Sequence, residues 1–325
     1  MPVIGTMIML IALFVGNLSD EGEYYNLGRF TKLFTIPWGN EKGKLSLKLL
    51  ELGPKYQVWN ADFPISVNDK GNRIIIGDRV KNQVYKFDEK GNLLLHIDLK
   101  GEEWELVDLC LDIKGNIIVL RFCRKERPAE NGVIQIFDRK GRLVKQFKPL
   151  IPISESSLIF IDNSGNIYVK RRSIWDFNIV RFNKDGHLID RFKGDKLVNS
   201  AITLDGKIFA LDLDNTLYIV DKPSSLKAVK RDVFPNELVY RPIGSDKKGN
   251  LYFVRFYFFQ PKVRTMDFIK LSPSGNVLFS ETVNIPPTQY QGKELACINI
   301  FSPSWLGANI DIDGDGNIYS TFAVI

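Results

Sequence analysis

The phrase Ile161-Asp162-Asn163-Ser164-Gly165-Asn166-Ile167-Tyr168-Val169 decides the fold, because close relatives of it recur along the chain. In each copy an apolar strand ends in a turn of the form Asp-x-x-Gly-Asn, and a second apolar strand follows at once. A tight turn between antiparallel strands needs a residue that tolerates a positive φ, as glycine does. The aspartate side chain can accept hydrogen bonds from the turn amides. The phrase therefore predicts a β-hairpin.

The copies recur at a spacing typical of propeller blades. Their turn glycines are Gly71, Gly115, Gly165, Gly206, Gly249 and Gly316, with separations of 44, 50, 41, 43 and 67 residues. Such a period suits a unit of four short antiparallel strands. A second turn follows in most units, at 88–91, 138–141, 183–186 and 272–275. We expect blades at 62–100, 106–149, 157–193, 199–233 and 241–285, with no second domain.

The last copy stops at residue 325 after two strands. Alternating apolar runs at 29–36 and 44–50 supply either the missing third and fourth strands or an accessory hairpin. A blade shared between the two ends of the chain would close a ring and leave no free sheet edge. The prediction is an all-β, six-bladed β-propeller with four antiparallel strands per blade, its last blade closed by N- and C-terminal strands.

The pattern Asp-x-x-Gly-Asn-Ile-Tyr-Val at 162–169, followed by the strand and turn at 178–186, resembles the NHL-repeat family of six-bladed β-propellers. The likeness covers nearly the whole chain after residue 19. The fourth unit departs from the pattern, because its first turn is shortened at 205–207 and Asp-Lys-Pro-Ser-Ser at 221–225 replaces the second glycine turn. The resemblance implies a fold more than a function, since such propellers serve as enzymes, RNA binders and protein scaffolds.

The N-terminal segment is apolar. Residues 1–18 carry no charged side chain, and 7–15 form a continuous apolar run. A membrane-spanning helix needs about 20 apolar residues, so a signal peptide over 1–19 fits better, although no basic residue precedes the run. A membrane anchor and a part of the fold are the alternatives. We expect a single exported domain over 20–325, periplasmic or extracellular, monomeric and without a stable membrane span.

The longer connections are expected to gather on one face of the propeller, because strand two-to-three loops and interblade connections share a side. The two-to-three segments at 78–83, 121–132, 170–178, 212–216 and 255–267 sum to a charge of +5, while the opposite turns are near neutral. Trp59, Trp104, Trp175 and Trp305 also fall on this loop face. The whole chain carries a net charge of +6, which favours anionic partners.

Basic side chains interleaved with aromatic ones suit an anion-binding surface. Arginine offers paired donors to phosphate, sulfate or carboxylate, and aromatic faces stack on bases, sugars or guanidinium groups. Simply solvated loops are the alternative. The candidate ligand-binding residues are Arg124, Lys125, Arg127, Arg171, Arg172, Trp175, Arg255, Lys262 and Arg264.

Asp311, Asp313 and Asp315 alternate as in the first half of a Ca²⁺-binding loop. The closing acid is missing, since Phe322 stands at that position, and the spacing also matches the turns of the other repeats. Turn chemistry and a Ca²⁺ site therefore compete for these carboxylates. The three cysteines, Cys110, Cys123 and Cys297, lack the short spacing of a metal or redox motif, so we expect buried free thiols.

Together these features predict an exported, non-catalytic binding or scaffold module whose loop face holds a protein, an anionic glycan or a small ligand. One alternative is an enzyme of the lactonase or lyase type with a metal at the central pore. Only two histidines are present, His96 and His187, which disfavours a histidine-ligated metal. No nucleophile motif or phosphate-binding glycine loop stands out. A second alternative is RNA binding, if the protein is intracellular.

Overall fold

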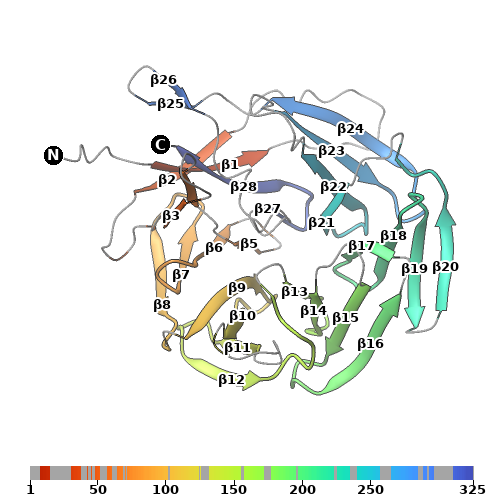
Figure 1. The fold of residues 1–325 in the computed structure, drawn as a ribbon, viewed down its shortest axis with the longest axis horizontal. Helices are drawn as coiled ribbons and strands as arrows, with labels where there is room; N and C mark the ends of the chain where they lie inside the picture. The colour runs from red at the N-terminus through yellow and green to blue at the C-terminus, as the bar shows by residue number, and fades with distance from the viewer. Residues whose placement is uncertain are drawn as a thin grey trace.

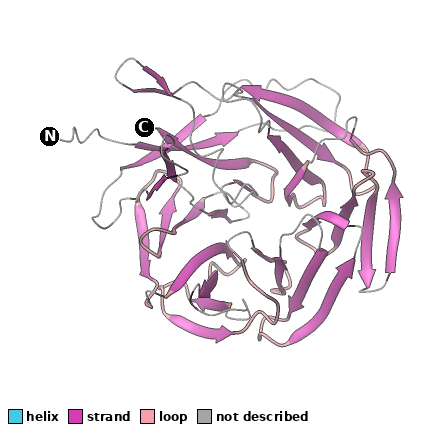
Figure 2. Ribbon diagram, in the orientation of Figure 1, coloured by secondary structure: helices cyan, strands magenta, loops and turns pink. Residues whose placement is uncertain are grey.

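The computed structural model describes most of the repeat region and parts of both termini. The described residues are 8–14, 31–37, 42, 45, 48–51, 57–60, 64–68, 70, 72–101, 103–123, 125, 132–154, 157–171, 177–194, 197–222, 225–234, 240–256, 265–284, 288–290, 293–295 and 310–324. Every regular element in these ranges is a β-strand (Figure 2). No helix among them is long and apolar enough to cross a bilayer. The predicted all-β class is confirmed.

Five sheets consist of four consecutive antiparallel strands each, as the repeats predict. They comprise β5 (Ile65–Val67), β6 (Arg73–Asp78), β7 (Gln83–Asp88) and β8 (Leu93–Asp98); β9 (Trp104–Leu111), β10 (Ile117–Cys123), β11 (Val133–Phe137) and β12 (Leu143–Phe147); β13 (Leu158–Ile161), β14 (Ile167–Arg171), β15 (Phe177–Phe182) and β16 (Leu188–Gly194); β17 (Leu197–Ile202), β18 (Ile208–Asp212), β19 (Leu217–Lys222) and β20 (Ser225–Lys230); and β21 (Arg241–Ser245), β22 (Leu251–Phe256), β23 (Thr265–Leu271) and β24 (Val277–Asn284). Figure 1 shows these blades arranged around an axis, with the first strand of each innermost. The fold is a β-propeller.

The termini depart from the predicted strands. A further four-stranded sheet has the order β2-β1-β28-β27, with β1 at Ile8–Phe14, β2 at Thr31–Pro37, β27 at Ile310–Ile312 and β28 at Ile318–Val324. The segment at 44–50 is not its fourth strand, because β3 (Lys48–Glu51) pairs with β4 (Gln57–Asn60) in a separate hairpin. Another hairpin joins β25 (Thr288–Tyr290) and β26 (Lys293–Leu295). The predicted six-bladed propeller, its last blade closed by C-terminal strands and the N-terminal runs at 29–36 and 44–50, is therefore corrected. The described structure has five blades of consecutive strands and a separate antiparallel sheet of terminal strands.

The terminal strands were predicted incorrectly because the glycine turn identifies only the two strands that it directly connects. The apolar run at β1 has no such turn beside it, and its composition suits an exported leader and a buried strand equally. In the structure β1 pairs with both β2 and β28. A signal peptide over residues 1–19, and with it the mature domain over 20–325, stays a prediction.

The repeated turns form as the sequence predicts. In the third blade, one Asp162 oxygen accepts the amides of Ser164 at 2.9 Å and Asn166 at 2.8 Å, and the other accepts the Asn166 side-chain amide at 2.8 Å. Gly165 has a φ of 83°, which an L side chain rarely adopts. The Tyr168 hydroxyl adds a fourth bond to Asp162, at 2.9 Å. The amide bonds recur at Asp112, Asp246 and Asp313, and the tyrosine bond recurs at Asp246 and Asp313.

The outer strands begin with a β-bulge. In the first blade both Leu93 and Leu94 fall opposite Phe87, because Leu95 pairs with Lys86. Bulges of this kind twist an edge strand away from pairing with another chain. The extra residue leaves aliphatic side chains exposed at the same place in four blades, at Leu93–Leu94, Leu143–Val144, Leu188–Ile189 and Val277–Leu278.

Candidate functional site

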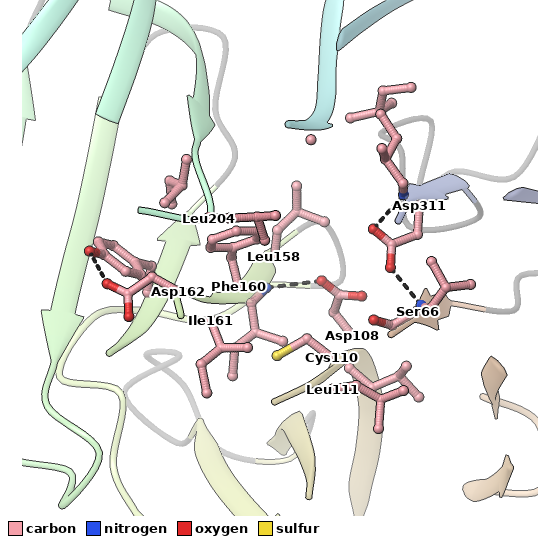
Figure 3. A pocket seen from close by; sticks show the side chains of 18 of the residues that line it. Ser66, Asp108, Cys110, Leu111, Leu158, Phe160, Ile161, Asp162, Leu204 and Asp311 are labelled. Carbon is pink, nitrogen blue, oxygen red and sulfur yellow. Dashed lines mark hydrogen bonds between the residues drawn. The ribbon is translucent and has the colours of Figure 1, made fainter. Parts of the chain in front are cut away.

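A cavity of about 260 Å³ lies where the inner strands converge (Figure 3). Its walls come from β5, β9, β13, β17, β21 and β27, together with residues of the first turns such as Asp112 and Asp162. Each of these strands is the innermost of its sheet and precedes the first turn of its repeat (Figure 1). The cavity therefore extends from the middle of the propeller toward the rim that carries the first turns.

Asp108 of β9 brings a carboxyl group into this apolar channel. Its side chain is buried, with 6% of the residue exposed, and one oxygen accepts the amide of Ile159 in the next blade at 2.9 Å. Burial raises the pKa of Asp108 to about 7, against the hydrogen bonds from Ile159 and Leu109 and the charge of Arg79, which lower it. Asp108 thus joins two blades through a hydrogen bond, and its carboxyl group titrates near neutral pH.

Asp311 of β27 likewise joins two neighbouring sheets through a hydrogen bond, here between β27 and β5. Its two oxygens accept the amide of Val67 in β5 at 2.7 Å and that of Ile312 at 2.9 Å. Although the residue as a whole is partly exposed, its carboxyl group is enclosed, and burial raises its pKa to about 6. The negative charge of Asp311 also helps to raise the pKa of Asp108, so the two carboxyl groups lie within electrostatic reach of each other.

Ser200 of β17 is a third polar group of the cavity wall. Only 6% of the residue is exposed, and its hydroxyl has no hydrogen-bond partner within the described part of the chain. Its backbone carbonyl accepts the ammonium group of Lys170 at 3.0 Å, so that cation also sits at the wall. An unsatisfied buried hydroxyl is unusual, because most buried polar groups find a partner.

The rest of the wall is mostly apolar. Leu158, Phe160, Ile161 and Leu204 face the space on the side away from Asp311 and Ser66, with Cys110 between them (Figure 3). Burial raises the pKa of the Cys110 thiol well above its ordinary value, as do the charges of Asp108 and Asp311. Cys110 and Cys123 are buried free thiols, as predicted, whereas Cys297 lies outside the described residues. Apolar walls with a few well-positioned polar groups are typical of small-molecule sites.

Most of the predicted loop-face residues lie outside the described ranges. These are Arg124, Arg127, Arg172, Trp175, Lys262 and Arg264. Lys125 is exposed, and Arg171 ends β14, where its backbone pairs with Asn178.

Arg255 does not fit a solvent-facing anion site. It is 8% exposed, its Nε lies 3.3 Å from an Asp267 carboxylate oxygen, and its guanidinium stands 5.7 Å from the centre of the Tyr240 ring. A buried arginine paired in this way neutralises an internal carboxylate. Its position within β22 gives no sign of this, since the partner Asp267 comes from the following strand, β23.

The three C-terminal aspartates serve different partners. Asp313 accepts the Asp315 and Asn317 amides and the Tyr319 hydroxyl, while Asp315 is exposed and its carboxylate lies 3.5 Å from the Lys247 ammonium. Asp311 is held by Val67 in the neighbouring sheet. Among the described residues no group of three or more potential metal ligands comes together. These carboxylates do not fit a Ca²⁺ loop in this arrangement, and Ca²⁺ binding stays a prediction.

Sequence reasoning missed the central cavity because it looked for long loops. A signal was present, since Asp108 interrupts the otherwise apolar run Leu106-Val107-Asp108-Leu109-Cys110-Leu111. A carboxyl group in a buried strand is costly unless it is hydrogen-bonded or paired with a charge, so apolar packing alone does not explain this aspartate. The sequence could not show that Asp311, more than 200 residues later, shares the same space.

No protein-family model and no curated protein matches the chain. Similar solved structures include a protein of unknown function from Bacteroides caccae, with a TM-score of 0.51 and 13% identity over 86% of this chain and 94% of that one. Virginiamycin B lyase from Staphylococcus aureus gives 0.47 and 16%, over 85% and 98% of the two chains. The β-propeller domain of Swd1 from Myceliophteria thermophila gives 0.43 and 12%, over 70% and 90%. These likenesses concern the fold alone, and membership of the NHL-repeat family is not confirmed.

Proposed function

We propose that this protein is a binding module that holds a small organic ligand in its central cavity. The cavity combines apolar walls with few polar groups, and its volume of about 260 Å³ is near the lower end of ligand pockets. Inner strands from separate sheets form the wall, so the site depends on the assembled propeller rather than on one loop. Export of the protein is part of this proposal and rests on the apolar N-terminus.

The observation that carries the proposal is a pair of carboxyl groups, those of Asp108 and Asp311, enclosed in a wall that is otherwise mostly apolar. Their hydrogen bonds come from backbone amides and, at Asp311, from the Ser66 hydroxyl. Burying a carboxyl group is costly unless it is hydrogen-bonded or paired with a charge, so a ligand group that supplies further bonds would be favoured there. The Lys170 ammonium, which donates to the Ser200 carbonyl, lines the same space.

Binding of a protein or anionic glycan on the loop face remains a separate prediction. Of its candidate residues, Arg255 is buried beside Asp267 and is therefore not available on the surface. The candidates outside the described residues are untested. A metal-dependent lyase or lactonase activity and RNA binding stay alternatives to the proposal. Neither has support from a described cluster of residues.

A fragment screen by ligand-observed NMR on the full chain tests the proposal, with Gly244→Leu as the cavity-filling variant. Gly244 lines the cavity, its φ is ordinary, and an added Cβ would stand 3.6 Å from Ile312. The longer side chain should therefore enter the free space and exclude fragments that bind the native protein. Ser225→Leu, on the exposed outer strand β20, adds a leucine without touching the site. The proposal fails if no fragment binds, or if Gly244→Leu binds the same fragments equally well.

A further inference from the structure

We infer that the central cavity selects ligands that carry a protonated amine or a similar organic cation, held between Asp108 and Asp311. This inference rests on the proposed function and adds the chemical class of the ligand. It depends on where the two carboxyl groups lie, on what already satisfies them, and on the character of the opposite wall.

The two carboxyl groups reach the cavity from strands on either side of β5. Asp108 projects from β9 and Asp311 from β27, and both side chains point into the same space (Figure 3). Strand β5 contacts both β9 and β27. Asp311 bonds to Val67 of β5 and Asp108 bonds to Ile159 of β13, so a ligand group in front of β5 and β9 would lie between the two carboxyl groups.

Neither carboxyl group has a cationic partner of its own in the described structure. The hydrogen bonds to Asp108 and Asp311 come from backbone amides and, for Asp311, from the Ser66 hydroxyl. Within the described ranges neither forms an ion pair. Arg79 is close enough to lower the pKa of Asp108, but its guanidinium donates to the Val107 carbonyl. When both carboxyl groups are ionised, the cavity wall therefore holds two negative charges that no ion pair among the described residues neutralises.

An organic cation would supply the missing compensation. Opposite charges within a few ångströms favour the ionised carboxylates, and the low-dielectric surroundings strengthen that attraction. An anionic ligand would meet the same two groups with repulsion. The Lys170 ammonium does not fill this role, because it is bound to the Ser200 carbonyl.

The remaining wall defines the body of the ligand. Leu158, Phe160 and Leu204 lie on the side of the cavity away from Asp311 (Figure 3). A compact apolar group attached to the amine would cover these side chains, and the cavity of about 260 Å³ limits it to roughly the size of one ring with a short arm. Small aryl- or alkylamines are therefore the expected class.

Isothermal titration of the full chain at about pH 8 with benzylamine, benzyl alcohol and benzoate tests this inference. The three probes share an apolar body and differ in charge. Benzylammonium should bind at least about tenfold more tightly than benzyl alcohol, and benzoate should bind more weakly still. Equal binding of the alcohol, or tighter binding of benzoate, would overturn the amine class while leaving a ligand-binding cavity intact. Failure of all three probes beside positive fragments of another class has the same meaning.

Two variants locate the binding. Asp108→Asn and Asp311→Asn each keep an oxygen that can accept the amide of Ile159 or Val67, so the blade contacts can survive. Each should weaken benzylammonium binding about tenfold and leave benzyl alcohol unaffected. Asp185→Asn, on an exposed turn, is the matched control and should change neither. Where one variant fails to fold, titrations of the native protein at about pH 5 and pH 8 report on the same carboxyl groups, because benzylammonium should bind about tenfold more weakly at pH 5, where both carboxyl groups are protonated, while benzyl alcohol should bind equally at both. Unaltered selectivity in both variants, or benzylammonium binding that does not change between these pH values, would refute the placement.

Discussion

Replacing Asp108 with asparagine should remove a cost that the native protein incurs as the pH rises. The pKa of Asp108 is raised from 3.8 to about 7 in the folded protein, mainly by burial. The folded state therefore binds more protons than the unfolded state between these values, and its stability falls as the pH increases through that window. The cost is small near pH 4 and is fully present above the folded pKa.

The magnitude follows from the size of the shift. Each unit of pKa difference corresponds to about 1.4 kcal/mol, so the full effect is about 4 kcal/mol, of which about 2.5 kcal/mol develops between pH 5 and pH 8. Asparagine has the same shape and keeps an acceptor for the Ile159 amide, but it carries no charge at any of these pH values. The variant should gain stability relative to the native protein as the pH rises.

Urea unfolding of both proteins at intervals from about pH 5 to pH 8 measures this difference, with linear extrapolation to zero denaturant. The two stability curves should diverge by about 2.5 kcal/mol over the range, whatever their offset at pH 5. Asp185→Asn should track the native curve, because this exposed residue has only a surface contact with Lys145. Parallel curves for Asp108→Asn would show that its carboxyl group is not titrating in this window.

Three further outcomes are expected. Gly206→Ala should destabilise the protein by about 1–3 kcal/mol and more than Gly165→Ala, because both residues have positive φ but only the Cβ at Gly206 would stand 2.7 Å from an Asp162 oxygen; equal thermal shifts would contradict this. Arg121→Met should cost about 3–5 kcal/mol in urea unfolding, since the buried guanidinium donates to the carbonyls of Lys100, Gly101 and Trp104; a loss below about 1 kcal/mol would show those bonds are dispensable. The combined replacement of Arg171, Arg172 and Trp175 by alanine should abolish capture of a loop-face partner in a pull-down while leaving the melting temperature nearly unchanged, and undiminished capture would remove that surface from consideration.

Much of the fold could be read from short-range signals. The glycine turns and their spacing located the five blades close to their observed limits, because a hairpin turn needs particular residues within five positions of one another. The terminal sheet was harder. Its strand β1 is joined to its neighbours by no marked turn, and β28 is paired with it from the opposite end of the chain. An apolar run of seven residues does not identify its own partner.

The candidate site shows the same limit more sharply. Long basic loops drew attention to residues such as Arg255, whose buried partner Asp267 is set by cross-strand pairing in the fifth blade. Asp108 was conspicuous as the charged residue of an apolar strand, but the sequence around it did not show which distant residues it contacts.

The amino-acid sequence by itself determined the all-β class, the repeating hairpins and the aspartate networks of their turns. Those features depend on backbone conformations and hydrogen bonds within one repeat. Only the tertiary structure decided which strands complete the terminal sheet and which side chains share the central cavity. Asp108, Ser200 and Asp311 meet there because the inner strands surround a common space, and the distances between them are set by packing between sheets that no local pattern encodes.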